Sequence, residues 1–334
     1  MISPQAVRLV IRHFDAIDRA VAKRTTRKRP WLETAITSYL CDLMDEETQI
    51  EEGLSYSIRD LNRELGSVDG LLDVRLTIDT HEYPPKLEHW VTQADLGFVL
   101  SFEDALLPDE SWSRAWLLQA KRIAPDTRNP LRYSETSRVS SIDSGQLTRM
   151  KRLNEILGND VVRYLLYCPR PELVDETTRQ KLLHLRRHDL VQHIFDYILG
   201  LELRGELERP DSTLAAGMFV APLDGAPRTL GEVHKTILAP TLPFSWFVVT
   251  HCFSSGPGTH RGMRHPEHVE PPHPNKDWVR GIVTGDRKAI DRLVATLGEA
   301  VDGPWPILPQ HTLTVRLGIG TSMDPEHRRI RVQG

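Results

Sequence analysis

Residues 90–122 read WVTQADLGFVLSFEDALLPDESWSRAWLLQAKR, two apolar, strand-like runs joined by a polar connection that contains a proline. Side chains alternate along a strand, which places Asp95 and Gly97 on one face of the first run and Gln119 and Lys121 on one face of the second. A lysine at the tip of an otherwise buried strand needs a partner. We therefore expect a carboxylate, an amide oxygen and an ammonium group to meet near the ends of these strands.

The composition is that of a soluble globular protein with one large or two modest domains: 334 residues, 40% hydrophobic and 26% charged. The net charge is −4, so any contact with nucleic acid must come from local patches. The three cysteines lie far apart in apolar stretches, which favours reduced core thiols over disulfides. The first residues lack a signal-peptide core, and no apolar run approaches the ~20 residues of a membrane span. We expect a cytoplasmic protein that does not contact the membrane.

Working outward toward the N-terminus, apolar residues recur at helical spacing over residues 5–22 and again over 31–47, and an alternating strand covers 71–80. The stripe of the second helix is Leu32, Ile36, Tyr39, Leu40 and Leu43. Glu33 lies beside that stripe, in the first turn. Its carboxylate either complements the helix dipole or reaches along the edge of the stripe into the sheet.

Toward the C-terminus, residues 124–142 have the composition of a loop, and a helix begins at 143 or 144 and stops at Gly158. Gln146 lies on the inward face of that helix. Residues 161–168 form a nearly all-apolar run typical of a strand buried on both sides. The predicted order over residues 31–168 is helix, strand, strand, strand, helix, strand.

Beyond residue 170 the patterns predict a helix over 172–203, strands over 218–222, 245–253 and 311–320, and helices near 230–238 and 287–301. These elements form either a second α+β region or an extension of the first sheet. Two further segments also have two interpretations. The basic run at 23–30 is a solvated linker or an arm that contacts phosphates. The histidine-rich segment at 251–275 is a surface loop or a zinc site, although its spacing matches no zinc finger or ribbon.

This order of elements, with these residues, resembles the restriction-endonuclease-like nuclease superfamily, whose common core is αβββαβ. The motif of that family is an acidic residue followed, on the next strand, by Asp/Glu/Gln-x-Lys. Here it is matched by Asp95 and by Gln119-Ala120-Lys121. The Gln-x-Lys form is similar to the variant in methylation-dependent restriction enzymes and phage-defence nucleases. The resemblance covers about residues 30–170.

The resemblance extends to two helical residues. In many members an acidic residue on the first helix completes a metal site, and Glu33 is in the matching position. In some members a glutamine on the helix after the motif also faces the site, as Gln146 does here. The resemblance implies an α/β (α+β) catalytic domain at 30–170, preceded by a helix and basic linker at 1–29 and followed by a C-terminal α+β region at 171–334.

Phosphodiester hydrolysis needs an oriented water and a neutralised phosphorane, and Mg²⁺ supplies both in a shell of oxygen ligands. We expect Asp95, Gln119, Glu33 and the main-chain carbonyl of Ala120 to bind the metal. A glutamine in place of a second carboxylate lowers the ligand charge, which favours Mn²⁺ as an alternative. Lys121 would then position the attacking water, unless it is only a surface lysine paired with Asp95.

These observations predict a metal-dependent nuclease that acts on DNA, within bacterial defence against foreign DNA. A partner protein of a defence system is expected because the chain has no Walker motif of its own. Cutting of both strands would require a homodimer. The alternative is a non-catalytic, nucleic-acid-binding or scaffold protein that keeps the nuclease fold. Gln119, which replaces the second carboxylate, favours this alternative, whereas the presence of Lys121 argues against it.

Overall fold

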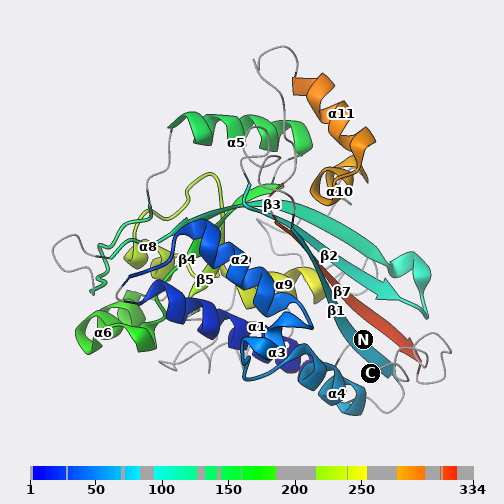
Figure 1. Cartoon of the computed structure of the whole chain (residues 1–334), viewed down its shortest axis with the longest axis horizontal. Coiled ribbons are helices and arrows are strands. Elements are labelled where there is room, and N and C mark those ends of the chain that lie inside the picture. The colour runs from blue at the N-terminus through cyan, green and yellow to red at the C-terminus, as the bar shows by residue number, and fades with distance from the viewer. Residues whose placement is uncertain are drawn as a thin grey trace, which may run out of the picture.

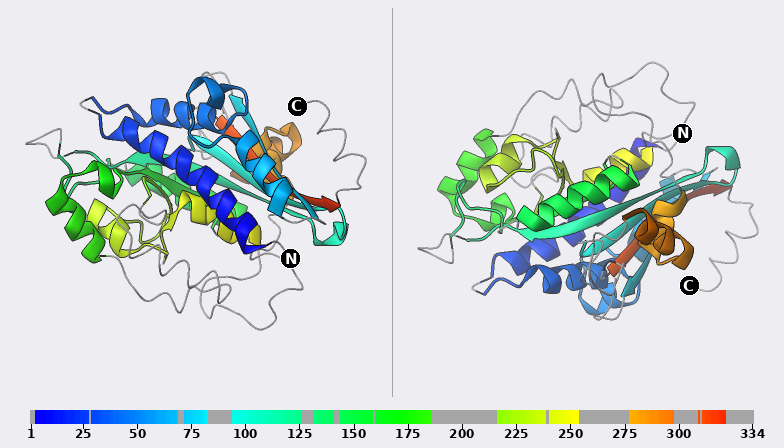
Figure 2. Two further views of the ribbon diagram at one scale, coloured as in Figure 1. Left: turned by 90° about the horizontal axis from the view of Figure 1, so that it is seen from below. Right: turned by 90° about the horizontal axis from the view of Figure 1, so that it is seen from above.

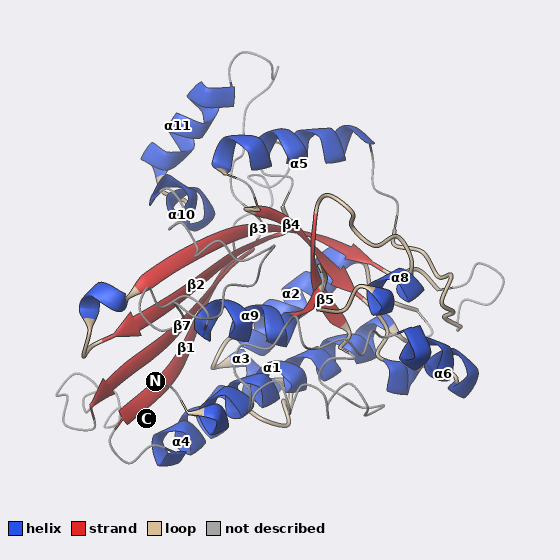
Figure 3. Cartoon of the chain, turned by 180° about the vertical axis from the view of Figure 1, so that it is seen from behind, coloured by secondary structure: helices blue, strands red, loops and turns tan. Residues whose placement is uncertain are grey.

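The strands of the described residues form one mixed, seven-stranded sheet in the order β1-β7-β2-β3-β4-β5-β6, and it is strongly curled (Figure 3). The computed structural model describes residues 3–27, 29–68, 72–82, 94–125, 132–140, 144–158, 160–185, 216–238, 240–253, 277–297, 309 and 311–321. The strands are β1 (Leu72–Glu82), β2 (Leu96–Asp104), β3 (Trp112–Arg122), β4 (Val162–Tyr167), β5 (Met218–Pro222), β6 (Leu242–Pro243) and β7 (His311–Thr321).

Helices cover both faces of this sheet (Figure 1). Helices α1, α2 and α4 lie below it, and α5, α10 and α11 lie above it (Figure 2). The helices are α1 (Pro4–Thr25), α2 (Glu33–Met44), α3 (Thr48–Glu51), α4 (Ile58–Val68), α5 (Ser144–Leu157), α6 (Glu176–Leu185), α8 (Leu230–Lys235), α9 (Phe244–Phe253), α10 (Asp277–Thr284) and α11 (Arg287–Leu297). None of the described helices is long and apolar enough to cross a membrane.

The predicted pair of central strands is present as the antiparallel pair β2 and β3. Phe98 lies opposite Trp116 in this pair, and both rings are fully buried. Phe247 of α9 packs edge-on against Trp116, with the ring centroids 5.0 Å apart. Burial of such aromatic side chains is the main source of stability for a core, so β2 and β3 are anchored at the middle of the molecule.

Strand β7 joins the two halves of the chain. In chain order the elements α2, β1, β2, β3, α5 and β4 follow the predicted sequence, but in space β7 separates β1 from β2. It is antiparallel to β1 and parallel to β2. In the described strands, therefore, the C-terminal region extends the first sheet.

Three sequence predictions are corrected by the fold. Residues 245–253 are not a strand; they belong to α9, whose aromatic and β-branched residues are buried on several sides of a helix, a pattern without a helical period. Leu32 is not part of the buried stripe of α2, because it precedes the helix and is 64% exposed. Asp95 precedes β2 in a bend instead of lying within the strand. The predicted helix over 172–203 is described only as α6, and residues 186–203 lie outside the described part.

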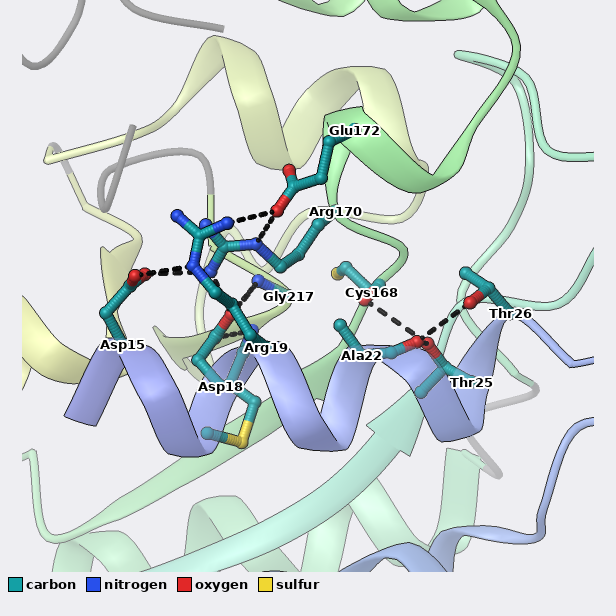
Figure 4. A network of polar contacts seen from close by, with 11 residues as sticks. Asp15, Asp18, Arg19, Ala22, Thr25, Thr26, Cys168, Arg170, Glu172 and Gly217 are labelled. Atoms are coloured by element: carbon teal, nitrogen blue, oxygen red, sulfur yellow. Dashed lines mark hydrogen bonds and ion pairs between the residues drawn. The ribbon is translucent and has the colours of Figure 1, made fainter. Parts of the chain in front are cut away.

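The N-terminal helix is fastened to the sheet by a buried charge network (Figure 4). Nη1 of Arg170, which is fully buried, lies 2.9 Å from Oδ1 of Asp15 and 2.5 Å from Oδ1 of Asp18. Asp18 also accepts hydrogen bonds from the main-chain nitrogens of Gly217 and Met218, at 2.8 and 2.6 Å. The network joins α1 to the chain after β4 and to the start of β5.

Candidate functional site

Asp95 and Gln119 are in direct contact, as the sequence predicts. Nε2 of Gln119 donates to Oδ2 of Asp95, and the main-chain nitrogen of Ala120 donates to the same oxygen at 2.7 Å. Asp95 is positioned by its own main chain, which donates to the carbonyl of Leu118 at 3.0 Å and thereby continues the β2–β3 ladder. The carboxylate is thus held between the ends of two central strands.

Gly97 allows the neighbouring elements to approach this point. A Cβ atom at position 97 would lie 2.8 Å from Cγ1 of Val283 and 2.8 Å from Cγ of Pro309. Real Cβ atoms do not come this close to other side chains, so only glycine fits without a shift of α10. The close approach of Val283 and Pro309 therefore explains why residue 97 is a glycine.

Lys121 and Gln146 form the second contact of the site. Nζ of Lys121 donates to Oε1 of Gln146 at 3.1 Å, and both side chains are half-buried. Lys121 lies near the C-terminal end of β3, and Gln146 lies in the first turn of α5. The contact agrees with the prediction that Gln146 is on the inward face of its helix.

Glu33 reaches the end of β3 through an intermediate residue. Its Oε1 accepts a hydrogen bond from the hydroxyl of Ser140 at 2.7 Å, and that hydroxyl lies 3.4 Å from the main-chain nitrogen of Arg122. The carboxylate of Glu33 is therefore fixed beside the residue that follows Lys121. Ser140 belongs to the segment that the sequence identifies only as a loop.

A buried tyrosine, Tyr167, is linked through Thr37 to the main chain of Glu33, and the sequence did not indicate it. The hydroxyl of Tyr167 lies 2.9 Å from Oγ1 of Thr37, which in turn donates to the carbonyl of Glu33 at 2.9 Å. Since Thr37 uses its hydrogen for Glu33, Tyr167 is the donor to Thr37. Burial raises the pKa of Tyr167 well above its usual value, and the charges of Asp95 and Glu33 raise it further. The hydroxyl thus joins the end of β4 to α2, the helix that begins at Glu33.

His311 is a second residue that the sequence did not indicate. It is buried at the start of β7, its main-chain nitrogen donates to the carbonyl of Asp95 at 3.3 Å, and its Nε2 lies 3.1 Å from the hydroxyl of Ser38 on α2. It comes to Asp95 only because β7 inserts beside β2. A local sequence pattern contains no signal for that placement.

Two of the predicted metal-binding oxygens converge on one position. Nε2 of Gln119 lies within hydrogen-bond reach of both Oδ2 of Asp95 and, at 3.3 Å, the carbonyl of Ala120. The side-chain NH₂ group of Gln119, which is positively polarised, therefore lies between the Asp95 carboxylate and the Ala120 carbonyl. Rotation of this amide about its soft terminal torsion would place its oxygen there instead. The donor set is all oxygen, which suits Mg²⁺ or Mn²⁺. Among the described residues, however, no group of three or more His, Cys, Asp or Glu side chains could hold a metal ion, so such a site would depend on the glutamine and the main chain.

Two further segments lie outside these contacts: the outer face of α5 and the start of the histidine-rich segment. Lys151 on the outer face of α5 pairs with Asp224 at 2.5 Å, and Arg152 lies 3.9 Å from Glu155, as expected for a solvated face. His251 and Cys252 of the histidine-rich segment are part of α9, and burial lowers the pKa of His251 to about 3. Residues 254–275, the rest of that segment, lie outside the described part of the chain.

Comparison of the chain with family models, with curated proteins and with solved structures gave no significant match.

Proposed function

We propose that the protein is a metal-dependent nuclease that hydrolyses DNA phosphodiester bonds. The observation that carries the proposal is the contact of Asp95 with both Gln119 and Ala120, next to the Lys121–Gln146 pair. An acidic oxygen, an amide, a main-chain carbonyl and a cation at the ends of two central strands are the groups that this reaction requires.

Each residue has a role in this proposal. Asp95, Gln119, Ala120 and Glu33 would hold Mg²⁺ or Mn²⁺, which when bound neutralises charge on the phosphoryl oxygens and activates a water. Lys121 holds the attacking water and stabilises the negative charge of the transition state. Gln146 fixes the direction of the Lys121 ammonium group through its side-chain oxygen. The restriction-endonuclease-like core, the defence role, the partner protein, the homodimer and the cytoplasmic location belong to the same proposal.

The second candidate is a DNA-binding or scaffold protein of the same fold without catalysis. It is favoured by the absence, in the described part of the chain, of three clustered acidic, histidine or cysteine ligands. The two candidates differ in how the protein should respond to added metal. A nuclease with a weak metal site should still bind the metal, whereas a protein that has lost its metal site should not.

The test is cleavage of supercoiled plasmid with Mg²⁺, with Mn²⁺ and with EDTA, by the wild-type protein and by Lys121→Ala. Lys181→Ala is the matched control, because Lys181 is an exposed lysine, paired with Glu135 outside the candidate site. The nuclease proposal expects metal-dependent nicking that is lost only in Lys121→Ala. Equal cleavage by both variants would remove Lys121 from the mechanism.

A thermal-shift measurement separates the two candidates without any cleavage. Binding of a metal to the folded protein alone raises the melting temperature, and EDTA reverses the effect. We expect Mn²⁺ to stabilise the wild-type protein but not Asp95→Asn. Absence of stabilisation in the wild-type protein, together with retained DNA binding, would favour the non-catalytic candidate.

A further inference from the structure

The described residues between α1 and α2, here called the basic arm (residues 26–27 and 29–32), contribute to a concave surface together with the first turn of α2. Arg27, Arg29, Trp31 and Leu32 are among the residues that line it. This surface combines guanidinium groups with an aromatic ring and an aliphatic side chain. It immediately precedes Glu33, and it is not part of the contacts around Asp95.

The two arginines give the basic arm a local positive charge in a chain whose net charge is −4. Within the described residues neither Arg27 nor Arg29 forms an ion pair, and both are exposed. Arg24, at the end of α1, differs from them because its guanidinium pairs with Glu52 at 3.5 Å. Its guanidinium lies over the rings of Trp31 and Tyr39, and the guanidinium of Arg27 also lies over the Trp31 ring, 5.7 Å from its centroid. Exposed arginines without an acidic neighbour are available to an anionic ligand.

The apolar part of the surface requires a ligand with apolar faces. Leu32 is 64% exposed, although it neighbours a buried helix. Trp31 is half-buried, and its ring is held edge-on against Tyr39 with centroids 5.5 Å apart. An indole with two guanidinium groups over its ring, beside an exposed leucine, is a mixed cationic and apolar surface suited to an unstacked base and its phosphates, whereas duplex DNA covers the faces of its bases by stacking.

The basic arm lies next to the candidate site. At its start, the carbonyl of Thr25 accepts a hydrogen bond from the hydroxyl of Tyr133 at 2.7 Å. At its end, Glu33 is held by Ser140. Tyr133 and Ser140 belong to one short segment, 132–140, that runs beside the end of β3, and the main chain of Ser140 donates to the carbonyl of Arg122 at 2.8 Å. The arm is therefore linked, through residues 132–140, to the end of β3 that carries Lys121.

We infer that the basic arm binds an unpaired DNA strand, with phosphates at Arg27 and Arg29 and a base against Trp31 and Leu32. The inference names the form of the substrate and in that respect rests on the proposed nuclease function. The binding itself needs no metal, because none of the four side chains is a predicted metal ligand. Binding in EDTA therefore tests the arm independently of cleavage.

The experiment measures fluorescence anisotropy of a labelled 12-nucleotide single strand with the full chain in EDTA, and of the same sequence as a duplex and as RNA. The variants are Arg27→Ala/Arg29→Ala and Leu32→Ser. Matched controls are Arg59→Ala/Arg63→Ala, two exposed arginines of α4 near the other end of α1, and Leu107→Ser, which replaces a leucine that is 60% exposed. Melting temperatures of all variants show that the fold is intact.

We expect the single strand to bind more tightly than the duplex. The double arginine variant should bind it about 25-fold more weakly near 0.1 M salt, with a salt slope smaller by about 1.4, because two phosphate contacts to a single strand are lost. Leu32→Ser should weaken binding about 5-fold, and the controls should not.

Equal affinities of the double variant and its arginine control would overturn the inference, as would a duplex bound as tightly as the single strand. Tighter binding of RNA than of DNA would overturn the assignment to DNA. Arm-dependent binding without metal-dependent cleavage would leave the arm in place and remove the nuclease function; cleavage without arm-dependent binding would do the reverse.

Discussion

The ammonium nitrogen of Lys121 lies 3.1 Å from the side-chain oxygen of Gln146, so the end of β3 and the first turn of α5 meet in a charge-assisted hydrogen bond. A lysine side chain has many rotamers, and a fixed acceptor restricts its ammonium group to one direction. The pair is thus suited to hold a cation at a defined place at the end of β3.

Gln146→Ala should lower the plasmid cleavage rate at least about 10-fold, since a hydrogen bond to a charged group contributes about 1.5–3 kcal/mol. Lys121→Ala should lower it at least about 100-fold, the usual effect of removing a group that stabilises transition-state charge. Initial rates under single-turnover conditions measure both effects. Thr148→Ala, an exposed change on the same helix, is the control. A Gln146 variant with the rate of the Thr148 variant would contradict the assigned role.

Tyr167→Phe should destabilise the protein by about 1 kcal/mol. The change removes the hydroxyl that donates to Thr37 and leaves the ring in its buried place. Urea denaturation followed by far-UV circular dichroism gives the free energy of unfolding.

Tyr164→Phe is a matched comparison on the same strand. The Tyr164 hydroxyl is also buried, but it has no hydrogen-bond partner among the described residues. Its removal should leave the free energy of unfolding unchanged or raise it by up to about 1 kcal/mol. Equal losses in the two variants would show that the Tyr167–Thr37 bond contributes nothing beyond packing.

Arg170→Met should destabilise the fold by about 3–5 kcal/mol. It leaves the carboxylate of Asp18 buried without its guanidinium partner, while Asp15 keeps its ion pair with Arg19, and uncompensated buried charge is costly. Arg59→Met breaks an ion pair in which the arginine side chain is 61% exposed, and it should cost less than about 0.5 kcal/mol. Denaturant midpoints of the two variants test the contrast, and similar midpoints would refute it.

His13 should make stability depend on pH. The ring is fully buried, and its Nδ1 donates to the carbonyl of Tyr56 at 3.0 Å. Burial lowers its pKa to about 4, so between pH 4 and its ordinary value of 6.5 the unfolded chain binds a proton that the folded chain does not. The stability that the neutral His13 ring contributes is therefore fully present above pH 6.5 and is lost as the pH drops to 4, by about 3 kcal/mol in the free energy of unfolding.

The free energy of unfolding, measured from pH 4 to 7.5, checks this expectation. His13→Asn keeps a donor for Tyr56 and cannot titrate, so its stability should change less with pH than that of the wild-type protein. His184→Asn, at an exposed histidine, should follow the wild-type curve. A His13 variant with the wild-type pH dependence would contradict the prediction.

Local patterns in the sequence were sufficient for most elements near the candidate site. Alternation predicted the strands that carry Gln119 and Lys121, and helical spacing predicted that Gln146 points inward. Gly158 ends α5 with a positive φ of 109°, as its position suggested. These predictions succeed because a strand or helix with one buried face repeats its apolar residues at a fixed period.

What the sequence by itself determined is therefore which side chains share a face and where β2 and β3 lie, the two strands at whose ends Asp95 and Gln119 meet. The tertiary structure alone decided that β7 separates β1 from β2 and brings His311 to Asp95, that Tyr167 connects Thr37 to the site, and that residues 245–253 form a helix. The physical reason is that strand pairing and burial on several sides depend on partners far along the chain. A local period records which face of an element is apolar, but it does not record which distant element covers that face.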